Sequence, residues 1–245
     1  ILKKIVMTPV TVQTDKPFLG NVEPIPGFTP VIISEHVSST HISPEMVLIP
    51  EGKYHKGRKE EMKVKSFYIG KYEVTNREYV KFLNNQKTIE PGWVLIINIA
   101  SRVLNGDIKQ PSSIKVKEGY EYYPLVEVSW FGAVAYCNWL SKEEGLEPVY
   151  MQKKGRVTGN LKKNGYRLPL ELEWKYACSG GSGEDHFYYW GEKVDGDYCW
   201  YKGNSGYSHE VGQKKPNAYS LYDMFGNAEE WCHNIESIRV DWSPG

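Results

Sequence analysis

The sequence contains few of the residues that build a metal cluster or a disulfide-rich scaffold. Only 4 cysteines occur among 245 residues, and no two of them form a CxxC pair. This spacing disfavours a zinc site built from ligand pairs, and the number is too small for a disulfide scaffold. The 6 histidines show no HxH, HxxxH or HExxH spacing. The sequence therefore predicts no local iron or zinc site.

Net charge and long apolar runs are also absent. Lys+Arg and Asp+Glu are balanced at 30 each, so no overall field attracts a polyanion, and no nucleic-acid partner is expected. The longest mainly apolar stretch, residues 93–100, is far shorter than the roughly 20 residues of a membrane-spanning helix. The chain begins at Ile1 rather than Met, so we expect an upstream piece such as a signal peptide or lipid-anchor segment.

Aromatic residues, glycine and proline are plentiful. The chain has 8 Trp, 18 Tyr and 7 Phe, together with 23 Gly and 14 Pro. This composition favours a loop-rich fold that packs around large rings over a helix bundle. Residues 1–45 are punctuated by proline and read as an extended N-terminal arm or linker, and residues 46–245 as the main domain.

Alternating and helical periodicities predict an α+β fold for this domain. Strands are expected at 46–52, 67–74 and 124–130. Thr75 and Glu78 form a capping box that opens a first helix, and Ser129 is a suitable N-cap for a second that Gly145 ends. A third helix follows Arg167-Leu168-Pro169, with Pro169 expected in its first turn.

Four ordered sequence blocks resemble the formylglycine-generating enzyme (sulfatase-modifying factor) family. They are FYIGKYEVTN at 67–76, PLVEVSWFGAVAYCNWL at 124–140, GYRLPLELEWKYACSGG at 165–181 and NAYSLYDMFGNAEEWC at 217–232. The resemblance implies a loop-rich α+β domain with a C-type-lectin-like fold. Leu170 replaces the small hydroxyl residue usual in the family, and Glu229 stands where an aromatic or apolar residue is common.

The cysteines do not match the catalytic pair of that family. The resemblance places the pair, which binds copper and activates oxygen, beyond the last of the four blocks, so we expect no copper site in this chain. Cys137 and Cys178 lie on apolar helix faces and are expected in the core. Pairing of Cys199 with Cys232 is left open by the sequence.

The resemblance also implies a calcium loop. Its ligands would be the side chain of Asn217 and the main-chain carbonyls of Ala218, Ser220 and Tyr222, because Ca²⁺ prefers hard oxygen ligands. The alternative is a plain Pro-Asn turn. Glu171 and Glu173 do not share a helix face, so they are interpreted as first-turn charges and not as a general acid and base.

The sequence supports two functional hypotheses. The favoured one is a non-catalytic binding protein, exported or at the cell surface, for an unknown protein or glycan ligand. In this respect the chain loosely resembles the Treponema variable surface proteins, which a retroelement diversifies. The alternative is a copper-dependent oxidase that converts a sulfatase cysteine to formylglycine, with its catalytic segment expected to be missing from this sequence. Ligand contacts are expected near the C-terminus and in a Tyr-rich loop, at His233, Asn234, Arg239, Trp242 and Tyr201.

Overall fold

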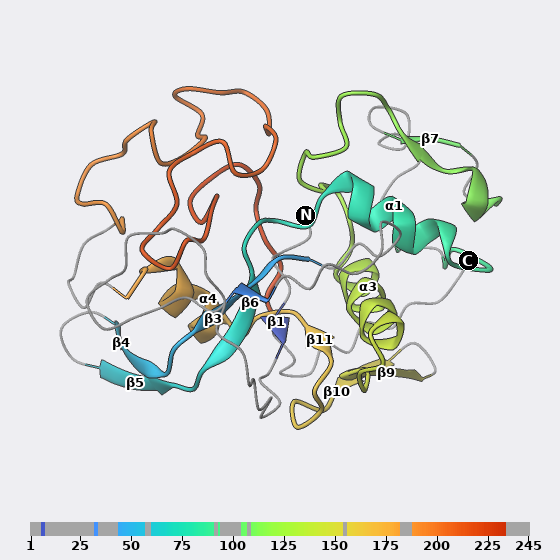
Figure 1. The fold of residues 1–245 in the computed structure, drawn as a ribbon, viewed down its shortest axis with the longest axis horizontal. Coiled ribbons are helices and arrows are strands. Elements are labelled where there is room, and N and C mark those ends of the chain that lie inside the picture. Colours follow the sequence, from blue (N-terminus) through green and yellow to red (C-terminus); the bar gives the residue numbers. More distant parts are fainter. Residues whose placement is uncertain are drawn as a thin grey trace.

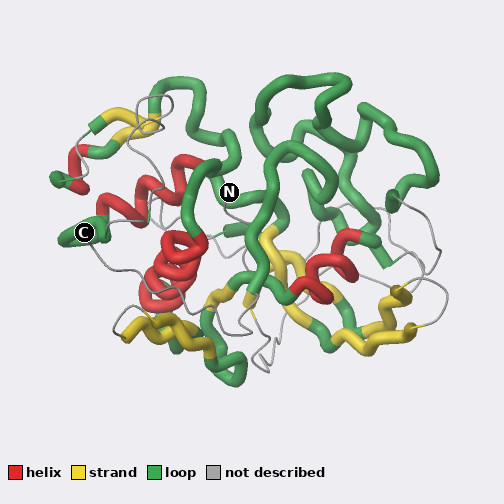
Figure 2. Tube along the Cα trace, turned by 180° about the vertical axis from the view of Figure 1, so that it is seen from behind, coloured by secondary structure: helices red, strands yellow, loops and turns green. Residues whose placement is uncertain are grey.

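The computed structural model describes nine segments of the chain. These are residues 6–7, 32–33, 44–56, 60–90, 93, 104–106, 109–153, 156–181 and 188–233. Helices and strands are short and are joined by long loops (Figures 1 and 2), so the described part has the predicted α+β character. No helix within these segments has the length and apolar character needed to cross a membrane.

A five-stranded antiparallel sheet forms the middle of the molecule. Its order is β11 (Tyr166–Arg167), β1 (Val6–Met7), β6 (Phe67–Gly70), β3 (Met46–Ile49) and β2 (Ile32–Ile33). Two of these strands, β1 and β2, come from the segment predicted as an N-terminal arm, and they pair with β6 and β3 of the main domain. The boundary at residue 45 stays a prediction.

The two faces of this sheet contact two different cores. Successive side chains of a strand point to opposite faces. Val47 and Ile49 of β3 therefore join a cluster with Tyr176 and Leu221, while Met46 joins another with Tyr79. Because both faces are covered, the strands are apolar along most of their length.

Helices α1 (Asn76–Asn84) and α3 (Trp130–Glu143) cover one side of the sheet (Figure 1). The predicted capping box of α1 is present: Thr75 and Glu78 exchange hydrogen bonds, with the Thr75 N–H donating to Glu78 Oε2 at 2.7 Å. Ser129 caps α3 through the N–H of Gly132, as predicted.

Helix α4 (Glu171–Cys178) lies on the other side with the β4 (Gly52–Lys56) and β5 (Glu60–Val64) hairpin (Figure 1). Pro169 was predicted in its first turn, and that prediction is wrong. The helix begins two residues later, because Leu170 is extended and its N–H donates to Glu173 Oε2 at 2.8 Å. Glu173 also holds Arg167 through two hydrogen bonds of 2.7 Å, so its role is structural.

The remaining regular elements are small. They are β7 (Leu104–Asn105), the 3₁₀ helix η1 (Pro111–Ser113), β8 (Lys115–Val116), β9 (Tyr150–Lys153) and β10 (Arg156–Gly159). The predicted strand at 124–130 is wrong. Pro124 forms only an isolated bridge with Thr75, and Glu127 interrupts the extended run because its φ is +57°.

Residues 188–233 form the loop layer above α4 and contain no helix or strand of their own. Ring stacking takes the place of regular hydrogen bonding in part of this layer. The Trp190 ring lies between Tyr188, at 4.7 Å between centroids, and Tyr198, at 5.0 Å. Trp190 therefore has a packing role in this layer.

Candidate functional site

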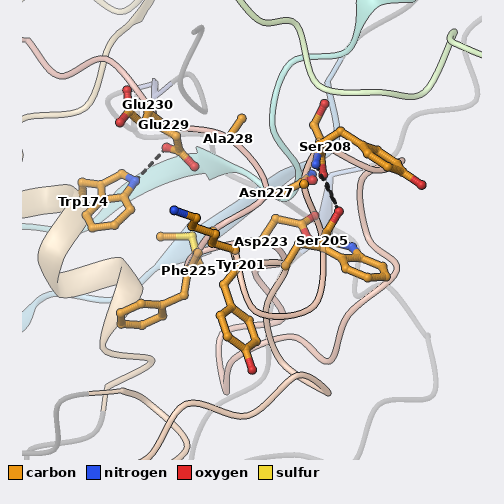
Figure 3. Close-up of a pocket in the computed structure, with 16 residues that line it drawn as sticks. Trp174, Tyr201, Ser205, Ser208, Asp223, Phe225, Asn227, Ala228, Glu229 and Glu230 are labelled. Atoms are coloured by element: carbon orange, nitrogen blue, oxygen red, sulfur yellow. Dashed lines mark hydrogen bonds between the residues drawn. The ribbon is translucent and has the colours of Figure 1, made fainter.

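An open cleft of about 760 Å³ lies within the loop layer. Two loops, 200–208 and 223–230, form most of its lining, and Trp174 of α4 contributes from one side (Figure 3). A cleft of this size matches the volume of typical ligand pockets. Its lining combines aromatic rings with hydroxyl and carboxyl groups, from residues such as Tyr201, Ser205, Tyr207, Ser208, Phe225 and Glu229.

A close backbone contact brings the two loops together. Gly226 forms a parallel bridge with Trp200, and the N–H of Asn227 donates to the Trp200 carbonyl at 3.1 Å. Gly226 has a φ of +82°, and a Cβ at this position would lie 1.8 Å from the Trp200 carbonyl oxygen. Only glycine fits such an approach, which explains the glycine of the GN-x-x-EW block.

A buried carboxylate anchors the same contact to the rest of the domain. Glu73, which is 1% exposed, accepts hydrogen bonds from Asn227 Nδ2 at 2.8 Å and from the N–H of Ala228 at 3.1 Å. Asn227 Oδ1 in turn accepts from the N–H of His209 at 2.8 Å. The Asn227 side chain therefore joins loop 223–230 to Glu73, between β6 and α1, and to His209, directly after loop 200–208.

Trp200 is held between two partners. His209 stacks on its ring at 3.7 Å between centroids, and Lys214 Nζ lies 3.7 Å from the ring centroid. Such a sandwich combines stacking with a cation–π contact. Trp200 thus has a packing role, and both faces of its ring are occupied.

Tyr201 and Tyr207 differ from Trp200 because they are exposed, by 38% and 73%. The exposure of Tyr201 makes it available for the ligand contact expected from the sequence. Two tyrosines beside an open cleft offer large amphipathic contact surfaces at small cost in conformational entropy.

Carboxylates lie along another part of the cleft. Glu229 is exposed, whereas Glu230 Oε2 accepts a hydrogen bond from Trp174 Nε1 at 2.7 Å (Figure 3). Asp223 is 2% exposed and accepts from the N–H of Gly212 at 2.7 Å. Of the three acids, Glu229 is thus the one that faces solvent.

His233 occupies a different environment from the surface expected for it. It is 9% exposed, its Nδ1 lies 2.8 Å from the Tyr150 hydroxyl, and its N–H donates to the Pro169 carbonyl at 2.8 Å. Burial, together with the charge of Arg167, lowers the pKa of His233 to about 4. Its contacts are those of a core histidine.

The other expected ligand contacts are distributed between the cleft and undescribed positions. Tyr201 lines the cleft. Asn234, Arg239 and Trp242 lie outside the described residues. Trp231 is 38% exposed, although its Nε1 donates to the Val128 carbonyl at 3.0 Å.

The predicted calcium loop is held by its own asparagine. Asn217 Oδ1 accepts hydrogen bonds from the N–H groups of Tyr219 and Leu221, at 3.0 and 3.1 Å, and its Nδ2 donates to the Ala177 carbonyl at 2.7 Å. A calcium ion coordinated by this oxygen would have to displace the two backbone bonds. The set Asn217, Ala218, Ser220 and Tyr222 stays a prediction as calcium ligands.

The four cysteines form no disulfide with one another. Cys137 belongs to the core around α1 and α3, and Cys178 to the core around α4, where its Sγ lies 3.6 Å from the Met224 carbonyl oxygen. Cys199 Sγ lies 3.4 Å from the Asp195 carbonyl oxygen. Burial raises the pKa of Cys137 and Cys199, which opposes the thiolate form that binds copper.

Within the described segments, no group of three or more His, Cys, Asp or Glu residues could hold a metal ion. The sequence predicted a ligand contact at Tyr201, which lines the cleft, but it did not indicate the rest of the cleft lining. The Ser-Gly-Tyr-Ser run at 205–208, adjacent to the GN-x-x-EW block in space but not in sequence, carries the signal that could have located it.

Comparison with known proteins places the chain in a family. The model of the sulfatase-modifying factor enzyme 1-like domain matches residues 34–238. The chain therefore belongs to the formylglycine-generating enzyme-like family, and its loop-rich α+β fold is of that type.

Relatives within this family carry different descriptions. The chain is 30% identical to chaperone protein LppX of Paenibacillus barcinonensis, covering 79% of this chain and 72% of that protein. It is 27% identical to formylglycine-generating enzyme of Bos taurus, with 72% and 50% covered. It is 26% identical to inactive C-alpha-formylglycine-generating enzyme 2 of the same species, with 74% and 64% covered. The chain thus spans less than two thirds of both bovine proteins.

A solved structure of similar fold is Treponema denticola variable protein 1. It is 26% identical, with a TM-score of 0.58, and the match covers 83% of this chain and 77% of that one. The loose resemblance to Treponema variable proteins is therefore confirmed at the level of fold.

Proposed function

We propose that this chain is a non-catalytic ligand-binding protein that holds a protein or glycan ligand in the cleft between loops 200–208 and 223–230. The observation that carries the proposal is the exposure of Tyr201 and Tyr207 beside a cleft of about 760 Å³. Aromatic rings interspersed with serine and glycine are typical of adaptable binding surfaces. Asn234, Arg239 and Trp242 remain proposed ligand contacts.

The framework beneath the cleft supports a pre-organised binding site. Gly226 and Asn227 join the two loops to buried Glu73, so the cleft walls are held by backbone and amide hydrogen bonds. Rigid support lowers the entropy that a ligand must remove on binding. The exposed rings can then adapt while the loops beneath them stay in place.

The alternative function is the copper-dependent oxidation of a sulfatase cysteine, which the similarity to bovine formylglycine-generating enzyme favours. The thiols of Cys137, Cys178 and Cys199 do not fit the required two-thiolate site, because each makes its contacts in a different part of the fold. The descriptions "inactive" and "chaperone" among the relatives support a family role without this chemistry. A fold by itself does not determine which activity a domain carries.

The proposed location is outside the cytoplasm, either exported or at the cell surface. Support comes from the structural similarity to a Treponema variable protein. Protease treatment of intact cells that express the native protein tests this location. Degradation without lysis is expected for a protein at the cell surface, and full protection until lysis would contradict the surface location.

Two assays test the function together. The full-length protein is applied to arrays of glycans and of peptides, and it is incubated with Cu(I), oxygen and a cysteine-containing sulfatase-motif peptide. We expect retention on a defined subset of array features and an unchanged peptide mass. Conversion of the cysteine to formylglycine, with no array binding, would replace the proposal by the oxidase.

A further inference from the structure

The β9–β10 hairpin and the turn after it concentrate positive charge in a chain that is neutral overall. Residues 151–165 contain no Asp or Glu but five basic residues, whereas Lys+Arg and Asp+Glu balance at 30 each over the whole sequence. The five are Lys153, Lys154, Arg156, Lys162 and Lys163. Local charge of this kind acts at short range even where the net charge is zero, because salt screens fields beyond about 10 Å.

The register of the β9–β10 hairpin determines which side chains face the core and which face solvent. Tyr150 is 4% exposed and Val157 packs against the core, so this face is the inner one. Met151 pairs with Thr158 on the opposite face, and both are exposed. Arg156 lies two residues before Thr158 and shares its outward face.

Two exposed apolar side chains belong to the same sequence segment as these basic residues. Met151 is 63% exposed, and Leu161, in the turn that follows β10, is 39% exposed. Lys162 is exposed beside Leu161, and Lys163 is half-buried. The side chains of Arg156, Lys162 and Lys163 have no ion-pair partner among the described residues.

Glu147 is an acidic residue near this surface. The N–H of Glu147 donates to Asn164 Oδ1 at 2.9 Å, which places Glu147 beside the end of the turn. Glu147 reduces the local positive charge but does not cancel it, because the hairpin and turn contain five basic residues.

We infer that this face, formed by Met151, Arg156, Leu161, Lys162 and Lys163, is a peripheral contact for anionic lipid membranes. Basic residues are attracted to anionic headgroups, and apolar side chains among them enter the boundary between headgroups and acyl chains. An acidic protein would satisfy the charges but would not need the exposed Met151 and Leu161. The hairpin lies at the outer edge of the molecule (Figure 1), where a flat bilayer can reach it.

The position of the hairpin sets an orientation. In Figure 1, β9 and β10 lie at the lower right, and the loops of residues 200–230 lie at the upper left. A membrane that contacts the hairpin would therefore leave the cleft facing solvent. The inference stands apart from the ligand proposed for the cleft.

Vesicle flotation tests the contact. The probes are phosphatidylcholine vesicles with and without about a third phosphatidylglycerol, mixed with the full-length chain at low and at high salt. We expect binding to the anionic vesicles alone, weakened by high salt. The triple variant R156E/K162E/K163E should lose at least about tenfold in affinity, because each basic residue adds to the attraction.

A charge-matched variant controls for net charge. K65E/K87E/K193E changes three exposed lysines elsewhere and should keep most of the binding. Equal loss in both triple variants would overturn the inference, as would no binding of the wild type.

A second variant, M151S/L161S, keeps every charge and removes the apolar contacts. It should weaken binding to anionic vesicles severalfold, with an unchanged circular dichroism spectrum as the check on folding. Undiminished vesicle binding would overturn the membrane assignment and indicate an electrostatic surface suited to acidic proteins.

Discussion

Gly226 and Asn227 occupy backbone conformations that few residues adopt, with φ values of +82° and +53°. Asparagine tolerates the left-handed region better than most side chains, and glycine enters it without steric cost. Both residues also make contacts that depend on their identity, Gly226 with the Trp200 backbone and Asn227 with Glu73. The cleft is thus built on two residues whose replacement is difficult.

Substitution of Gly226→Ala should destabilise the fold. The added Cβ would lie 1.8 Å from the Trp200 carbonyl oxygen at a positive φ, so we expect a loss of about 3 kcal/mol in the free energy of unfolding. Chemical denaturation measures it. Gly206→Ala is the matched control, because a Cβ there has no atom within 4 Å, and equal effects of the two substitutions would contradict the account.

His233 should make stability depend on pH. Its pKa is lowered to about 4 in the folded protein, against about 6.5 when unfolded, so the unfolded state binds the extra proton first. The contribution of neutral His233 to the free energy of unfolding is full above pH 6.5, and it is lost as the pH falls towards 4. We expect it to reach about 2 kcal/mol, allowing for solvent screening.

The difference between wild type and His233→Gln isolates this contribution. The free energy of unfolding of both proteins is measured by denaturation from pH 4 to 7.5. The wild type should lose more stability than the variant between pH 6.5 and 4. Parallel curves would show that His233 is not buried in its neutral form.

Among the features of the helices and strands, the sequence predicts the helix starts best. Thr75, Glu78 and Ser129 act locally, within one turn of the helix that they cap, so their roles follow from spacing alone. The start of α4 was misplaced because Glu173 bonds both Leu170 and Arg167, and the second of these contacts depends on the neighbouring strand β11. Tertiary partners decide a helix end where no side-chain cap is present.

Thr75→Ala should lower the free energy of unfolding by about 1–2 kcal/mol. It removes the N-cap hydroxyl and leaves Glu78, whose pKa burial raises, with one hydrogen-bond partner fewer. Urea denaturation checks the value against Thr88→Ala, a substitution of an exposed threonine after the helix. If Thr75→Ala lowers the free energy of unfolding no more than Thr88→Ala does, the capping box does not stabilise α1 in solution.

At the scale of the whole molecule, the α+β class and the family could be predicted because four blocks carry local, ordered signals. The cleft could not, since Trp174, Tyr201 and Glu229 come from three separate segments. Their meeting depends on the Gly226–Trp200 bridge and on buried Glu73. Neither contact has a sequence spacing that reveals it. The burial of His233 could not be predicted for the same reason, because its partner Tyr150 lies 83 residues away.

The central claim, ligand binding in the cleft, is tested most directly by comparing dissociation constants for an array ligand. The proteins are the wild type, Tyr201→Ser/Tyr207→Ser, and the control Tyr120→Ser, which changes an exposed tyrosine outside the cleft. Loss of two aromatic contacts should raise the Kd of the cleft variant by at least about tenfold and leave that of the control unchanged. An unchanged Kd in the cleft variant would show that the ligand binds elsewhere and would contradict the account.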